Sequence, residues 1–212
     1  EYVGYGAADA AIQALDDDAT IVDQQAFSIA MRRRSLLIGA TNVKLALAVS
    51  AGLIPRALFH ADTKTQLTPE ELEGIGIMQI TEGEIQLQTE VNVIELGPLA
   101  IAAIPGEMYP ELWLEAEGGG HYLERPQGAD FPDAPFETPI QSMLPDDSIP
   151  VIINNANDAT GYIIPYAQWD EVAPYAYVEE GEGAQYGEEN SLGAQTAPSL
   201  NEAFGMMMDG AP

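Results

Sequence analysis

The chain has 212 residues, of which 46% are hydrophobic, so it is long and apolar enough for one domain with a sizeable buried core. It carries 34 acidic and 7 basic residues, a net charge of −27, which disfavours nucleic-acid or membrane-surface binding by bulk charge. There is no cysteine and no apolar run of the roughly 18 residues that a transmembrane helix needs, which argues against disulfides, thiolate zinc sites, a cysteine nucleophile and a membrane span.

The acidic charge is uneven along the chain. Residues 1–64 hold 7 acids and 6 bases, so the remaining 27 acids and a single base, Arg125, lie in residues 65–212. Such a surface favours solubility in salt, cation binding or a basic partner, and we expect a secreted or cell-surface protein. The aspartate run at 16–18 lacks the ligand spacing of an EF-hand loop. Because position 1 is glutamate, we expect a processed or partial chain.

The first third of the chain predicts two helices and a strand. Residues 7–15 are rich in alanine with apolar residues at helical spacing, and residues 42–53 are apolar nearly all round, which predicts a buried helix. Partial alternation predicts a strand over residues 20–31. We expect the arginines at 32–34 to pair with nearby acids; a proteolytic site or an anion contact is the alternative.

The middle of the chain predicts a helix start and a hairpin. Thr68 is followed by proline and two glutamates, a combination typical of a capped helix N-terminus. Residues 84–96 alternate between apolar and polar side chains, which predicts an antiparallel strand with one face in water. Gly97-Pro98 then turns the chain into a buried strand over 99–104.

The rest of the chain predicts a second buried strand and a terminal helix. A short helix over 109–115 is followed by residues 117–148, which have no apolar period and predict an irregular insertion. Residues 150–153 predict a buried strand and residues 194–208 a helix. The fold class that we predict is α/β, a mixed sheet with flanking helices, either as a single domain over 1–212 or as part of a larger α/β catalytic domain.

Two buried strands are each followed by a cluster of polar side chains that could act as metal ligands or catalytic groups. Glu107 follows Ile104-Pro105-Gly106 and is placed with little freedom, as a metal ligand or general base requires; alternatively it only stabilises the start of the next helix. In the segment 154–165, Tyr162 follows Gly161 and could direct its hydroxyl into a site. Alternatively, the asparagines and the aspartate of this segment only form hydrogen bonds with the loop backbone. If strands 99–104 and 151–153 are parallel neighbours, both clusters lie at one sheet edge, where ligands bind.

These segments resemble a known family. IPGE at 104–107, NDATGYIIP at 157–165, YGEENSLG at 186–193 and APSLNEAF at 197–204 are similar in content and order to motifs of the neutral, non-lysosomal ceramidases, especially their bacterial relatives. The resemblance covers about residues 24–205. General hydrolase, P-loop and dinucleotide motifs are absent from the sequence.

The resemblance implies a zinc-dependent amidohydrolase that cleaves the amide of N-acylsphingosine-type lipids. It implies that Glu107 and Tyr162 are zinc ligands and that Gly106, Asn157, Asp158 and Gly161 support the site loops. In the family, two histidine ligands and a serine motif lie upstream of the matched region. We expect His60 and His121 to be structural or exposed, so we assign no catalytic residue, and zinc would be held only if histidines from a missing N-terminal half complete the site.

Three functions therefore stay open from the sequence. The chain is the C-terminal portion of a secreted ceramidase-like enzyme, with the missing half as partner and a lipid amide as substrate. Alternatively, it is a processed acidic subunit of an extracellular filament or coat that binds copies of itself. The third hypothesis is an acidic module that binds cations or a basic partner. Neither nucleic acid nor a transmembrane segment is expected in any of them.

Overall fold

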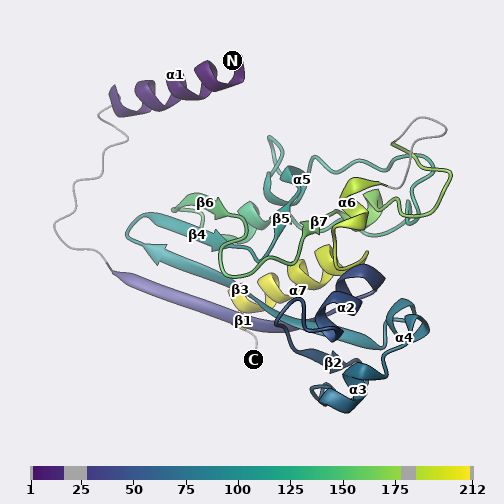
Figure 1. Cartoon of the computed structure of the whole chain (residues 1–212). Coiled ribbons are helices and arrows are strands. Elements are labelled where there is room, and N and C mark those ends of the chain that lie inside the picture. The colour runs from purple at the N-terminus through teal and green to yellow at the C-terminus, as the bar shows by residue number, and fades with distance from the viewer. Residues whose placement is uncertain (1, 17–27, 178–184, 211–212) are drawn as a thin grey trace.

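The core of the fold is a five-stranded mixed sheet built around one long strand. The computed structural model describes residues 2–16, 28–177 and 185–210 (Figure 1). Strand β3 (Ile85–Leu96) pairs along one edge with the antiparallel strand β1 (Ile29–Gly39). Its other edge pairs with β2 (Leu58–His60) near its start and with β4 (Leu99–Ala103) near its end, both antiparallel. Strand β6 (Ile149–Ile153) then adds parallel to β4.

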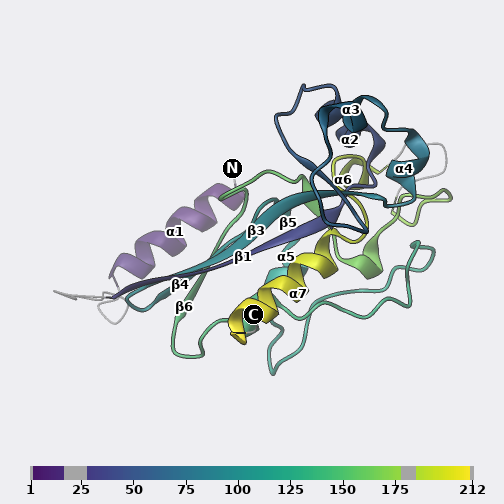
Figure 2. The same cartoon turned by 90° about the horizontal axis from the view of Figure 1, so that it is seen from below.

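Helix α7 (Thr196–Met208) covers one face of this sheet, as Figure 2 shows. It packs Leu200, Phe204 and Met207 against the core. The chain is thus an α/β protein with a mixed sheet and flanking helices, which confirms the predicted fold class.

The other helices are short, apart from α1 at the N-terminal end. They cap the ends of the sheet or lie in its connections. Their bounds are α1 Tyr2–Asp16, α2 Val43–Ser50, α3 Pro69–Glu73, α4 Ile77–Thr81, α5 Pro110–Trp113 and α6 Tyr186–Glu189, with 3-10 turns η2 Ile140–Met143 and η3 Tyr166–Gln168. Within the described ranges, no helix combines the length and the apolar character that crossing a membrane requires.

Several local predictions are confirmed because short-range signals dominate there. Thr68 caps α3 in a reciprocal capping box with Glu71. The alternation in β3 buries Ile85, Leu87, Val91 and Val93 on one face, and Gly97 turns the chain into β4. Residues 117–148 contain η2 and are otherwise turns, bends and irregular backbone, as predicted.

The strand predicted over 20–31 is shifted. Strand β1 begins at Ile29 and runs through the three arginines, and residues 20–27 lie outside the described residues. Arg32 pairs with Glu95 at 3.0 Å and Arg33 with Glu90 at 3.7 Å, so tertiary pairing with the acids of β3 places these charges within the strand. The expected pairing with nearby acids is therefore confirmed for Arg32 and Arg33.

Two further predictions of complete burial are wrong. Helix α2 buries only Ala46 and Val49, since only one of its sides faces the core. Strand β6 is an outer strand of the sheet in the described structure, and Ile149 and Ile153 at its two ends are each nearly half-exposed. An apolar run therefore does not reveal by itself which neighbour covers it.

The sheet face opposite α7 carries a broad apolar surface, which we call the open face. The strand registers align side chains of β1, β3, β4 and β6 in rows across it. Ile29 is 70% and Met31 60% exposed, and the inner positions are half-buried. The open face consists of Ile29, Met31, Ile94, Leu96, Leu99, Ile101, Ile149, Val151 and Ile153.

Candidate functional site

The two polar clusters singled out in the sequence meet at one edge of the sheet. Strands β4 and β6 are parallel neighbours, which meets the condition for the two clusters to share one edge, so the chain leaves both in the same direction. The two segments then pair again as a short parallel sheet of β5 (Glu107–Met108) and β7 (Tyr162–Ile163). Glu107 and Tyr162 are direct register partners in this second sheet, although they lie 55 positions apart in the chain.

Backbone hydrogen bonds hold the two segments together. The Thr160 amide donates to the Pro105 carbonyl at 2.7 Å, and the Glu107 amide donates to the Gly161 carbonyl at 2.9 Å. A Cβ on Gly106 would collide with the Gly161 carbonyl, and Gly161 itself has φ +86°, a left-handed conformation that favours glycine. Glycine at both positions therefore allows the backbones to approach closely enough to set Glu107 beside Tyr162.

A third segment, the loop that follows α6, closes the site. The Tyr162 amide donates to the Asn190 carbonyl at 2.9 Å. Asn42, which caps α2 through its side-chain oxygen, donates its Nδ2 to the carbonyls of Glu189 and Ser191 at 2.9 and 2.8 Å. Asn42 thus joins the N-terminal part of the chain to the site.

The three segments and α2 enclose a pocket of about 520 Å³. Glu107 and Tyr162 both line it, next to amide and hydroxyl groups and to a small apolar patch. The other lining residues are Asn42, Lys44, Leu45, Ala48, Asn155, Ala159, Thr160, Gly161, Tyr186, Glu189, Asn190 and Ser191.

The phenol of Tyr162 and the carboxylate of Glu107 interact directly. Desolvation raises the pKa of Tyr162 above 10.0, and the negative charge of Glu107 and the hydrogen bond between the two groups raise it further. At neutral pH the phenol therefore keeps its proton and can serve as a hydrogen-bond donor to the carboxylate.

Neither histidine reaches this pocket. His60 lies on β2 with its Nε2 3.3 Å from Glu71 Oε1, and the His121 ring packs against Phe136 at 4.2 Å between centroids. In the described part of the chain, no three or more histidine and acidic side chains are grouped so as to hold a metal ion. The carboxylate of Glu107 is a type of ligand that zinc accepts, and the described residues do not supply a full set of ligands around Glu107 and Tyr162.

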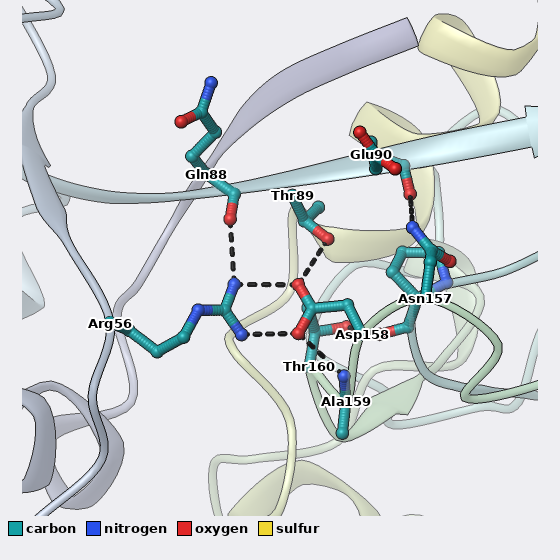
Figure 3. A network of polar contacts seen from close by, with 9 residues as sticks. Arg56, Gln88, Thr89, Glu90, Asn157, Asp158, Ala159 and Thr160 are labelled. Atoms are coloured by element: carbon teal, nitrogen blue, oxygen red, sulfur yellow. Dashed lines mark hydrogen bonds and ion pairs between the residues drawn. The ribbon is translucent and has the colours of Figure 1, made fainter. Parts of the chain in front are cut away.

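The loop residues Asn157 and Asp158 face the sheet rather than the pocket (Figure 3). Asp158 binds Arg56 through both oxygens at 2.5 and 2.7 Å, and it accepts a hydrogen bond from Thr89 Oγ1 at 2.7 Å. Asn157 Nδ2 donates to the Glu90 carbonyl at 2.8 Å.

This network fills an interruption in the sheet. Strand β2 pairs with residues 85–87 of β3 and β4 with residues 92–96, so residues 88–91 have no strand on that side. Arg56 Nη2 donates to the Gln88 carbonyl at 2.8 Å, and Asn157 Nδ2 donates to the Glu90 carbonyl. These two bonds satisfy backbone acceptors of β3 that no neighbouring strand reaches. Both side chains therefore support the site loop from behind by anchoring it to β3.

Sequence reasoning identified the two central residues and missed several that organise them. Asn42 and Arg56 carry no local pattern that ties them to a loop more than a hundred positions away. Tyr186 and Asn190 belong to the segment YGEENSLG, so that motif was the available signal for them.

Comparison with known proteins adds no relative: no family model, curated protein or solved structure matches this chain. The family resemblance of the four motifs is therefore a hypothesis that depends on the motifs themselves.

Proposed function

We propose that this chain supplies the Glu107 and Tyr162 side of a ceramidase-like zinc amidohydrolase site, acting on lipid amides at the cell surface or outside the cell. The observation that carries the proposal is the direct pairing of these two residues in a 520 Å³ pocket. When bound, zinc would polarise the amide carbonyl and lower the pKa of a water molecule.

The chain's own residues suit the handling of an amide. Asn155, Asn190 and Ser191 line the pocket with groups able to hydrogen-bond an amide, and Leu45 and Ala48 offer apolar contact to an acyl chain. The Glu107 carboxylate is exposed to the pocket beside the Tyr162 phenol, so its negative charge can hold a cation at that point.

The nitrogen ligands would come from another polypeptide segment, because His60 and His121 lie elsewhere. Zinc normally needs three or four protein ligands, and this chain offers two. The proposed partner is therefore the histidine-bearing half of the enzyme.

Cobalt(II) titration with added imidazole tests this proposal on the chain alone. Imidazole replaces the absent histidines, and excess magnesium occupies the nonspecific carboxylates of so acidic a protein. We expect cobalt to bind with the absorption intensity of a four- or five-coordinate ion. Its affinity should fall about tenfold or more in Glu107→Gln and in Tyr162→Phe, because each variant loses one direct bond to the metal.

Glu117→Gln is the matched control, because Glu117 is exposed and lies outside the pocket. Equal cobalt affinity of the wild-type chain, Glu107→Gln and Tyr162→Phe would overturn the proposal.

The open face favours a second candidate function, that of a self-assembling acidic subunit. Nine apolar side chains in register across four strands form a surface large enough to associate with a second copy. In that case the Glu107 and Tyr162 pocket would have no catalytic role. Measurement of the oligomeric state, described in the Discussion, tests this candidate separately from metal binding.

A further inference from the structure

A second pocket also borders Tyr162, and tyrosine is the commonest residue type in its wall. Its volume is about 450 Å³, and Tyr109, Tyr162, Tyr177 and Tyr186 all contribute to its wall. The remaining lining residues are Glu111, Ile164, Gln168, Gln185, Gly187 and Glu188, so the described part of the wall includes two carboxylates and no cationic side chain.

The tyrosine rings stand at steep angles to one another, as the walls of a box do. The Tyr109 and Tyr162 centroids are 6.3 Å apart with their planes at 82°, and those of Tyr162 and Tyr186 are 5.7 Å apart at 67°. A Cβ on Gly187 would lie 2.7 Å from the Tyr109 hydroxyl, so glycine at this position leaves room for that ring. Rings set this way present more than one aromatic face to a single bound group.

The carboxylates make the interior of this pocket negative. Glu188 is 8% exposed, and its Oε1 accepts the Asp170 amide at 3.1 Å. Glu111 Oε2 is buried and has no hydrogen-bond partner among the described residues. A buried carboxylate oxygen without a partner costs stability, and a positive charge bound nearby would offset part of that cost electrostatically.

The pKa shifts of neighbouring groups reflect burial first and nearby negative charge second. Burial raises the pKa of Glu188, and the charge of Asp170 adds to that effect. Burial followed by the charges of Asp170 and Glu188 raises the pKa of Tyr177 to about 12.

We propose that this pocket, called the tyrosine cage below, binds an alkylated ammonium group of the trimethylammonium type. Aromatic faces attract cations, and a bulky, weakly hydrated cation loses little hydration on entering an aromatic site. A small metal ion prefers a shell of oxygens, which four rings and two separated carboxylates do not form. The proposal does not depend on zinc and holds equally for an enzyme fragment or an assembly subunit.

Calorimetric titration with choline against its neutral isostere 3,3-dimethylbutan-1-ol tests the cage. The two ligands have nearly the same shape, so a difference in affinity reports the positive charge. We expect choline to bind at least tenfold more tightly, which corresponds to about 1.4 kcal/mol and lies within the range of cation–π and ion-pair contributions. Phosphocholine, which adds negative charge, should bind more weakly than choline.

Variants identify the groups responsible. Tyr109→Leu should abolish choline binding, whereas Tyr109→Phe keeps the ring and should retain it within a few fold. Glu111→Gln keeps the shape and removes the charge, and should weaken binding about three- to tenfold. Tyr122→Leu is the control, because Tyr122 is an exposed tyrosine outside the pocket.

Four results would overturn the tyrosine cage. These are equal affinity for choline and its neutral isostere, no choline binding at millimolar concentration, unchanged binding in Glu111→Gln and Tyr109→Leu, or tighter binding of phosphocholine than of choline. Retention by Tyr109→Phe serves as the check that loss in Tyr109→Leu is not caused by misfolding.

Discussion

At the scale of single residues, Glu137 is a buried carboxyl whose ionisation opposes folding. Its Oε1 accepts the Tyr166 amide at 3.0 Å, and its Oε2 is buried with no hydrogen-bond partner among the described residues. Burial raises the pKa of Glu137 above 4.5. The folded state therefore holds this proton more tightly than the unfolded state does.

The pH dependence of stability follows from this sign. Below pH 4.5 both states are protonated and there is no penalty; as the pH rises through 4.5 and then through the higher folded-state pKa, wild-type stability falls. The glutamine in Glu137→Gln does not titrate. The difference in the free energy of unfolding, wild type minus variant, should therefore decrease with rising pH and then level off. Urea unfolding from pH 4 to 8 measures this difference, with Glu117→Gln as an exposed control. A flat or rising difference would contradict the assignment.

Gly161 is the residue on which the close approach of the site segments depends most. Its φ of +86° strains any other residue, and a Cβ there would collide with the Asn190 carbonyl. Gly161→Ala should destabilise the fold by about 3 kcal/mol or more, because the strain of a left-handed alanine, about 1–2 kcal/mol, is added to the collision.

Gly118→Ala is the matched control for this variant. Gly118 has φ +85° with open space around it, so alanine there meets only the conformational strain. Chemical unfolding of both variants separates the two costs, and equal losses would mean that the collision at Gly161 relaxes freely.

At the scale of elements, the loop after β6 is held to β3 by the Arg56–Asp158 pair. The pair is mostly shielded from water, with 24% and 18% of the two side chains exposed. Loss of either partner leaves the other charge without compensation. Loss of Arg56 also removes its hydrogen bond to the Gln88 carbonyl, and loss of Asp158 removes the carboxylate that accepts the Thr89 hydroxyl.

Arg56→Gln and Asp158→Asn should each cost about 2–3 kcal/mol in the free energy of unfolding, with a coupling energy of at least ~1 kcal/mol in the double variant. Arg32→Gln, which breaks the more exposed Arg32–Glu95 bridge, should cost under ~1 kcal/mol. Urea denaturation of the wild type, the two single variants, the double variant and Arg32→Gln measures these losses. Additive losses in the double variant would show that Arg56 and Asp158 act independently.

At the scale of the whole molecule, apolar contact and charge repulsion have opposite effects on the self-association of this chain. The open face favours contact with a second copy, whereas the net charge of −27 makes copies repel. Salt screens the repulsion and leaves the apolar contact intact, so self-association should increase with ionic strength.

Ile149→Lys should abolish this association, because it places a charge at one edge of the open face. Light scattering of wild type in high salt should give multiples of the 22.7 kDa chain mass, and the variant should stay at the single-chain mass. Ile77→Lys is the control, since Ile77 is also an exposed isoleucine but lies on α4. A wild-type monomer at all salt concentrations would rule out self-assembly through the open face.

Part of this architecture could be predicted from the sequence because it depends on neighbours in the chain. The alternation of β3, the turn at Gly97, the Thr68 cap and the position of Glu107 and Tyr162 after two strands are set by local patterns. The start of β1, the exposure of β6 and the roles of Asn42 and Arg56 depend on partners distant in sequence, which no local pattern encodes.

Composition and short-range periodicity were enough to predict the α/β class, the strong negative charge and the two polar clusters. The pairing of Glu107 with Tyr162, the pocket with four tyrosines in its wall and the uncovered sheet face among the described residues follow from the folded arrangement alone. The physical reason is that strand register and loop packing bring together residues far apart in the chain, and the free energy of those contacts depends on the whole fold.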